Sequence, residues 1–84
     1  MSALYFVPVR QSRCGTLALC TGRLVDGEHV GIAFSSAAAL VATLGPRQPW
    51  IHLTMGALRE MLVPIGVAEV RIDPLPAVLV AAAA

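Results

Sequence analysis

Short apolar runs separated by turn residues dominate the chain, and this pattern predicts several strands with short helices. Residues 3–9 form a continuous apolar run and predict a strand. Pro8 favours one of two arrangements, because proline has no N–H for the ladder. Either this strand lies at a sheet edge, or Pro8 lies near the end of the strand. Residues 16–25 and 28–34 alternate on either side of Asp26-Gly27, a dipeptide typical of β-hairpins.

A two-residue loop at Asp26-Gly27 would set the register of this hairpin. Counting back from the loop places Arg23 opposite Val30 and Leu19 opposite Phe34. Paired residues share a face, so the large apolar residues gather on one side of the hairpin. The other side carries small residues, namely Cys20, Gly22, Gly31 and Ala33. We expect either close approach by a helix or another subunit there, or plain exposure.

Two short helices are predicted after the hairpin. Ser35-Ser36 supplies an N-cap for residues 37–44, and Gly45-Pro46 is a stop signal. Thr54 caps a second helix that runs to about Leu62, because Pro64 restrains the residue before it. Each helix has an apolar stripe at helical spacing that should face the sheet. The stripes are Ala37, Leu40, Val41 and Leu44 in the first helix, and Met55, Leu58, Met61 and Leu62 in the second.

The remaining segments complete an α+β pattern. Residues 49–53 predict a loop or a very short strand, and residues 67–73 alternate as a half-exposed strand with Ala68, Val70 and Ile72 inward. Residues 75–84 are an apolar, alanine-rich tail that either adds an edge strand through 78–80 or frays. We therefore expect one domain over residues 1–74, with a mixed or antiparallel sheet of four to five strands covered on one face by two helices.

Composition adds an expectation of self-association. Of the 84 residues, 57% are hydrophobic and 13% are charged. A chain this short has little interior in which to bury so many apolar side chains, so we expect a homo-oligomer or a protein partner.

The first helix supplies a candidate contact surface. Its outer face has no charge, whereas a helix exposed to water normally carries several. The residues of this candidate surface are Ala38, Ala39, Ala42 and Thr43. The alternative is that alanine codons are simply common in a GC-rich bacterial genome.

Charge and hydropathy argue against two classes of partner. The net charge is +1, and the six arginines are scattered, so nothing resembles a nucleic-acid-binding patch. The longest uncharged stretch, residues 30–46, is too short and too interrupted to span a membrane. The first ten residues lack the basic start and the cleavage site of a signal peptide, so we expect a cytoplasmic protein.

The sequence contains no catalytic, cofactor or metal motif. Cys14 and Cys20 would lie about 20 Å apart on one strand, too far for a disulfide, so free thiols are expected. With His29 and His52 they show none of the paired spacings of zinc ligands. No carboxylates are evidently paired for acid–base chemistry, and Glu69 with Arg71 reads as a surface ion pair. We therefore predict no catalytic residues, no cofactor and no metal, and whether the chain is an enzyme stays open.

Three blocks together resemble the SseB N-terminal-domain family, in particular its short stand-alone actinobacterial members. They are residues 4–9, residues 26–36, and residues 58–67 with Ile72-Asp73-Pro74. The resemblance implies a small α/β domain of unknown function with no defined catalytic residues. The chain departs from the family at Ser35-Ser36, where Thr-Ser is usual, and at Ala39, where an acidic residue is frequent, which leaves the capping box incomplete.

Two functions follow from these observations. The first is a non-catalytic cytoplasmic interaction, regulatory or accessory module that self-associates and presents a sheet edge or the uncharged helix face. The alternative is a small-ligand-binding protein or minimal enzyme accessory to a biosynthetic pathway. Its candidate pocket lies near Trp50, the single tryptophan, and His52.

Overall fold

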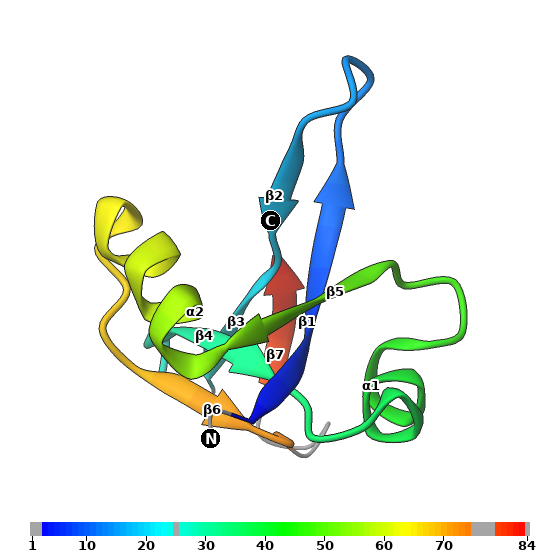
Figure 1. Ribbon diagram of the computed structural model, residues 1–84. Helices are drawn as coiled ribbons and strands as arrows, with labels where there is room; N and C mark the ends of the chain where they lie inside the picture. The colour runs from blue at the N-terminus through cyan, green and yellow to red at the C-terminus, as the bar shows by residue number, and fades with distance from the viewer. Residues whose placement is uncertain (1–2, 25, 75–78, 84) are drawn as a thin grey trace.

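The structure is a computed structural model that describes residues 3–24, 26–74 and 79–83. These residues form two α-helices, a short 3-10 helix and seven strands (Figure 1). In chain order they are β1 Leu4–Gln11, β2 Leu17–Leu19, β3 Thr21–Leu24, β4 His29–Ala33, α1 Ala37–Leu44, β5 Trp50–Thr54, α2 Met55–Leu62, η1 Val63–Ile65, β6 Val70–Ile72 and β7 Leu79–Ala83.

The strands form two sheets, ordered β2-β1-β5 and β6-β4-β3-β7. Every pairing is antiparallel except that of β4 with β6, so the four-stranded sheet is mixed. Phe6 of β1 and Phe34 after β4 join the two sheets through two backbone hydrogen bonds of 2.8 Å. The predicted α+β class is confirmed. A single mixed or antiparallel sheet of four to five strands was predicted, whereas the strands form an antiparallel sheet of three and a mixed sheet of four. The segment predicted as a loop or very short strand is β5.

β1 is a central strand despite its proline. It lies between β2 and β5, and its hairpin with β2 projects from the body of the molecule (Figure 1). β5 pairs with Leu4 to Pro8, and β2 pairs with Val9 to Gln11. Pro8 therefore lies where one partner strand ends and the next begins, the position within a ladder at which a missing N–H is best tolerated.

Two clusters of buried side chains form the core, and each includes one helix. Leu58 and Leu62 of α2 pack with Val7, Ala33 and Val67. Leu40 of α1 packs with Leu24, Val30, Ile32 and Phe34. Successive residues of a strand point to opposite faces, so β4 is covered on both sides. The helices thus divide between two faces instead of sharing one, because β4 is apolar on both of its faces.

The β3–β4 hairpin has a register one residue away from the predicted one. Arg23 pairs with His29, and Gly22 pairs with Val30. The Leu24 N–H donates to the Glu28 carbonyl at 2.8 Å, so three residues instead of two separate the last paired positions. A three-residue hairpin loop needs a residue with positive φ, and Gly27 supplies it at +90°. The predicted two-residue loop is therefore wrong.

The side of β4 that carries Gly31 and Ala33 is approached by a helix, one of the predicted alternatives. Gly22, predicted on the same side, pairs with Val30 and therefore lies on the opposite face. Gly31 lies under Leu62 of α2, and a Cβ atom on Gly31 would lie 2.5 Å from Leu62 Cδ1. Because Gly31 has no side chain, α2 can pack closely against β4.

Both predicted helix caps are confirmed. The Ala39 N–H donates to Ser36 Oγ at 3.1 Å, and the Ala57 N–H donates to Thr54 Oγ1 at 3.1 Å. α2 ends at Leu62, before Pro64, and Gly66 closes the following 3-10 turn with φ +75°. Local capping and proline effects therefore account for where both helices begin and where α2 ends.

The predicted strand over residues 67–73 is shorter, and its inward and outward residues differ. Val67 is buried, because its N–H donates to the Leu62 carbonyl and keeps it against α2. Strand pairing starts only at Val70, and Ile72 is 47% exposed.

Asp73 ties the end of β6 to the start of α1. Its carboxylate accepts hydrogen bonds from the Ser35 N–H at 2.8 Å and from Ser35 Oγ at 2.6 Å. β6 ends at Ile72, one residue before the end predicted for this strand. β7 pairs with β3 over Leu79–Ala83. An edge strand through residues 78–80 was one of the two alternatives predicted for the tail. Residue 78 lies outside the described residues.

Candidate functional site

Trp50 and His52 lie together on one face of β5, and both rings make edge-to-face contacts with Phe6 of β1. The ring centroids are 4.7 Å apart for Phe6 and Trp50, 4.5 Å for Phe6 and His52, and 5.2 Å for Trp50 and His52. The β1–β5 register produces this cluster, since Phe6 pairs with His52 and Pro8 pairs with Trp50. Trp50 is 37% exposed, so the cluster is accessible at the surface.

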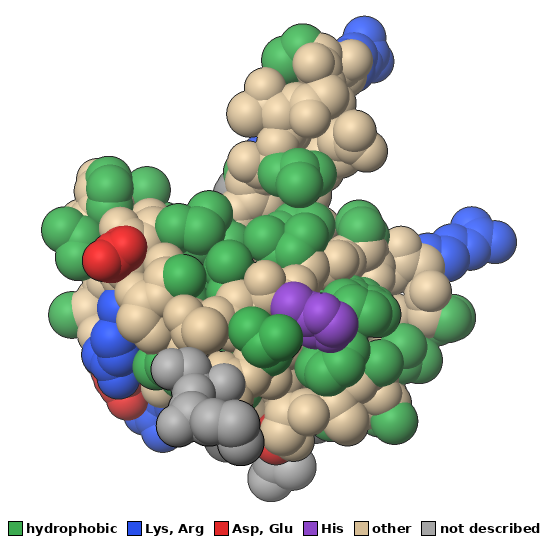
Figure 2. All heavy atoms as spheres, viewed as in Figure 1, with side chains coloured by type: hydrophobic (Ala, Val, Ile, Leu, Met, Phe, Trp, Pro, Cys, Tyr) green, Lys and Arg blue, Asp and Glu red, His purple; other side chains and the backbone are tan. Residues whose placement is uncertain are grey.

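α1 adjoins this cluster. Phe6, Ala39 and Leu44 are all partly buried against the same core cluster, which places α1 beside the Phe6 side of β1. We define the aromatic face as the exposed or partly exposed residues of this region, namely Leu4, Phe6, Trp50 and His52 with Ala38, Val41 and Ala42 of α1. Hydrophobic side chains spread over this side of the molecule, with charged side chains towards its margins (Figure 2).

The predicted contact surface on α1 needs one correction. Ala38 and Ala42 are exposed and Thr43 is half-buried, but Ala39 packs against the core. Val41, predicted to face the sheet, is exposed instead. The helix is rotated because its one fully buried residue, Leu40, occupies the centre of the contact, with Ala39 rather than Val41 beside it.

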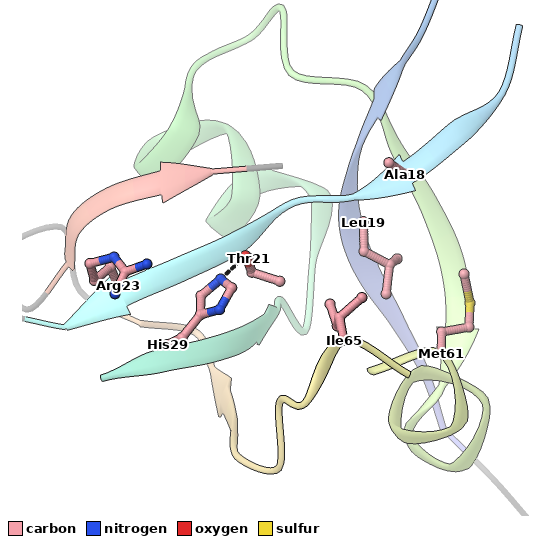
Figure 3. A pocket seen from close by; sticks show the side chains of 7 residues that line it. All are labelled: Ala18, Leu19, Thr21, Arg23, His29, Met61 and Ile65. Atoms are coloured by element: carbon pink, nitrogen blue, oxygen red, sulfur yellow. Dashed lines mark hydrogen bonds between the residues drawn. The ribbon is translucent and has the colours of Figure 1, made fainter. Parts of the chain in front are cut away.

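A groove of about 520 Å³ lies between the β2–β3 segment and α2 with η1 (Figure 3). One end is apolar, lined by Ala18 and Leu19 on the strand side and by Met61 and Ile65 on the helical side. Leu19 packs against the α2 cluster whereas Phe6 packs against the α1 cluster. The groove and the aromatic face therefore lie on opposite faces of β1.

The other end of the groove is polar and carries Thr21, Arg23 and His29. His29 Nε2 is hydrogen-bonded to Thr21 Oγ1 (Figure 3). Arg23 and His29 are direct partners in the β3–β4 ladder, so their side chains leave the same face of the sheet. Arg23 Nη1 also donates to the Gly27 carbonyl at 2.9 Å.

Sequence reasoning missed this groove because it used the wrong hairpin register. Opposite Val30, Arg23 would point into the α1 cluster, away from His29. The observed register puts Leu24 and Val30, both in the core, on one face. The predicted register gathers Leu19, Val30 and Phe34 on one face instead, so matching apolar positions across the strands does not choose between the two registers.

Glu28 and Glu69 come close together, a pairing that sequence reasoning did not anticipate. Hydrogen bonding with Glu69 and the negative charge of that residue raise the pKa of Glu28. Arg71 Nε lies 3.0 Å from Glu69 Oε1, which confirms the predicted ion pair. All three side chains are at least partly open to water, so this group is a solvated surface cluster.

The two cysteines are free thiols in contrasting surroundings, as predicted. Cys14 lies exposed at the tip of the β1–β2 hairpin, whereas Cys20 is buried. Hydrogen bonds with the Ser12 and Thr16 hydroxyls lower the pKa of Cys14 to about 7. Burial raises the pKa of Cys20.

The described ranges hold no candidate metal centre and no candidate membrane-spanning helix. Nowhere in these ranges do three or more His, Cys, Asp or Glu side chains gather in a way that suits a metal ion. Within the same ranges, neither helix has the length and hydropathy required to cross a bilayer. No family model, no curated protein and no solved structure matches this chain. The resemblance to the SseB N-terminal-domain family stays a prediction.

Proposed function

We propose that this chain is a non-catalytic cytoplasmic interaction module that pairs with a second copy of itself through the aromatic face. The observation that carries the proposal is the partly exposed cluster of Phe6, Trp50 and His52 beside a helix that has no charged residue. Aromatic side chains are enriched in protein interfaces and dominate their binding energy.

The shape of the neighbouring helix supports a second copy as the partner. Ala38 and Ala42 leave the backbone of α1 open to close approach, and Val41 adds an exposed apolar side chain between them. The whole chain exposes 5227 Å², against about 4,800 Å² expected for a monomer of its mass. A dimer that removes about 800 Å² from each copy would be of ordinary size.

The free thiols support the cytoplasmic part of the proposal. Cys14 is exposed and unpaired, a state that persists in a reducing compartment and is vulnerable in an oxidising one.

Light scattering over about 1–100 μM tests the proposal. We expect the mass of a dimer for the wild-type chain and a shift towards the monomer for Ala42→Glu, because the new carboxylate would have to be buried in the interface. Val63→Glu is the matched control. Val63 is 72% exposed on η1, outside the aromatic face, so the same charge there should leave the dimer intact.

Circular dichroism would establish that both variants are folded, and glutamate suits an exposed helical position. A wild-type chain that stays monomeric over the whole concentration range contradicts the proposal. Equal loss of the dimer in Ala42→Glu and Val63→Glu would move the interface away from the aromatic face.

A further inference from the structure

We infer that the groove between β2–β3 and α2–η1 binds a small apolar monocarboxylate, such as a medium-chain acyl carboxylate. This site goes beyond the proposed self-association, because the groove and the aromatic face lie on opposite faces of β1. The inference rests on the division of the groove into an apolar end and a cationic end (Figure 3).

The apolar end suits an alkyl chain. Leu19 and Ala18 form one wall, and Met61 and Ile65 form the other. Met61 is 44% exposed and Ile65 is 54% exposed, so much of this helical wall is open to water. A ligand that covers both walls would remove this apolar area from water, and methionine adapts its shape to such a ligand.

The polar end suits a carboxylate. Arg23 lines this end, and although its Nη1 donates to the Gly27 carbonyl at 2.9 Å, the other N–H groups of the guanidinium can donate to a carboxylate. In the described part of the chain, the one ion pair joins Arg71 to Glu69, so no carboxylate of these residues neutralises Arg23. His29 is the ladder partner of Arg23, so its ring lies on the same face of the sheet, where Nε2 is hydrogen-bonded to Thr21 Oγ1. With a proton on Nδ1, the ring has a further donor for a carboxylate that Arg23 binds.

The size of the groove selects small ligands. At roughly 30 Å³ for each water-sized group, its volume of about 520 Å³ holds about seventeen such groups. Octanoate, with about ten non-hydrogen atoms, fits along the groove with room for water at the open side. A diacyl lipid or a long peptide would extend well beyond it.

NMR titration of the isotope-labelled full chain with octanoate tests this site. Octanamide is the matched probe, since it has the same length and no charge, and acetate supplies the carboxylate without the chain. We expect octanoate to perturb the amides of Leu19, His29 and Met61. Its dissociation constant should be about tenfold lower than that of octanamide, because a charged hydrogen bond is lost with the amide. Acetate should bind more weakly than either.

Two exposed arginines provide the matched variants. Arg23→Gln should abolish the preference for octanoate over octanamide, whereas Arg59→Gln, on the exposed side of α2, should preserve it with the same change in net charge. Met61→Ser should weaken octanoate and octanamide by the same factor, since it removes apolar contact alone.

Three results would overturn the inference. They are equal binding of octanoate and octanamide by the wild-type chain, equal effects of Arg23→Gln and Arg59→Gln, and perturbations centred on Trp50 and His52. Because the aromatic face is separate from the groove, any of these results leaves the light-scattering test of self-association unaffected.

Discussion

At the scale of single residues, neighbouring hydroxyl groups and burial give the two thiols different chemistry. Ser12 Oγ lies 3.1 Å from Cys14 Sγ, and Thr16 Oγ1 lies 3.5 Å from the same sulfur. Both hydroxyls can donate to the thiolate, which lowers the pKa of Cys14 to about 7. Cys20 has the opposite behaviour, because burial disfavours its charged form and raises its pKa.

We expect the rate of Cys14 alkylation by iodoacetamide to rise with pH around a midpoint of about 7, since the thiolate is the nucleophile. Ser12→Ala should move that midpoint upward, because the hydrogen bond with Ser12 is the largest cause of the lowered pKa. Peptide mass spectrometry measures the rate at each thiol separately.

Cys20 is the internal control for this measurement and should be alkylated only after denaturation. If Cys14 showed the midpoint of an ordinary thiol, about 8.5, in both the wild-type chain and Ser12→Ala, the hydroxyl groups would have no influence on its pKa.

At the scale of secondary-structure elements, the packing of α2 on β4 depends on a missing side chain. A Cβ atom at Gly31 would meet Leu62 Cδ1 at 2.5 Å and Val70 Cγ2 at 3.3 Å. Gly31→Ala should therefore lower the free energy of unfolding by about 1–3 kcal/mol, because α2 or Leu62 must shift. Urea denaturation followed by circular dichroism measures the loss.

Gly56→Ala is the control for Gly31→Ala. Nothing lies within 4 Å of a Cβ atom at Gly56, which belongs to α2. Alanine there should leave stability unchanged or raise it by about 0.5 kcal/mol, through the higher helix propensity of alanine. If Gly31→Ala were as stable as Gly56→Ala, the close approach of α2 to β4 would be wrong.

The elements also show how far a sequence pattern predicts contacts. The caps at Ser36 and Thr54 were predictable because each depends on hydrogen bonds within a few residues. The register of the β3–β4 hairpin was not, because two- and three-residue loops both suit Asp26-Gly27. The one-residue difference moved Arg23 into the groove, beside His29. The predicted pair of Trp50 and His52, by contrast, follows from i and i+2 spacing on one strand.

At the scale of the whole molecule, self-association would couple stability to protein concentration. If the folded chain is a dimer, its Tm should rise by a few degrees for each tenfold increase in concentration, because dissociation accompanies unfolding. Ala42→Glu should show a Tm that does not depend on concentration, and Val63→Glu should behave as the wild-type chain does. Differential scanning fluorimetry at several concentrations makes the comparison, and a constant Tm for the wild-type chain would contradict self-association.

The sequence by itself determined the local features of this protein: the α+β order of elements and the helix caps. Each follows from chain stereochemistry and hydrophobic period over a few residues. Tertiary structure alone decided the hairpin register, the division of the helices between two faces of β4, and the joining of Arg23, His29 and Met61 in one groove. These depend on which apolar surfaces bury each other over long sequence separations, a choice that no local pattern contains.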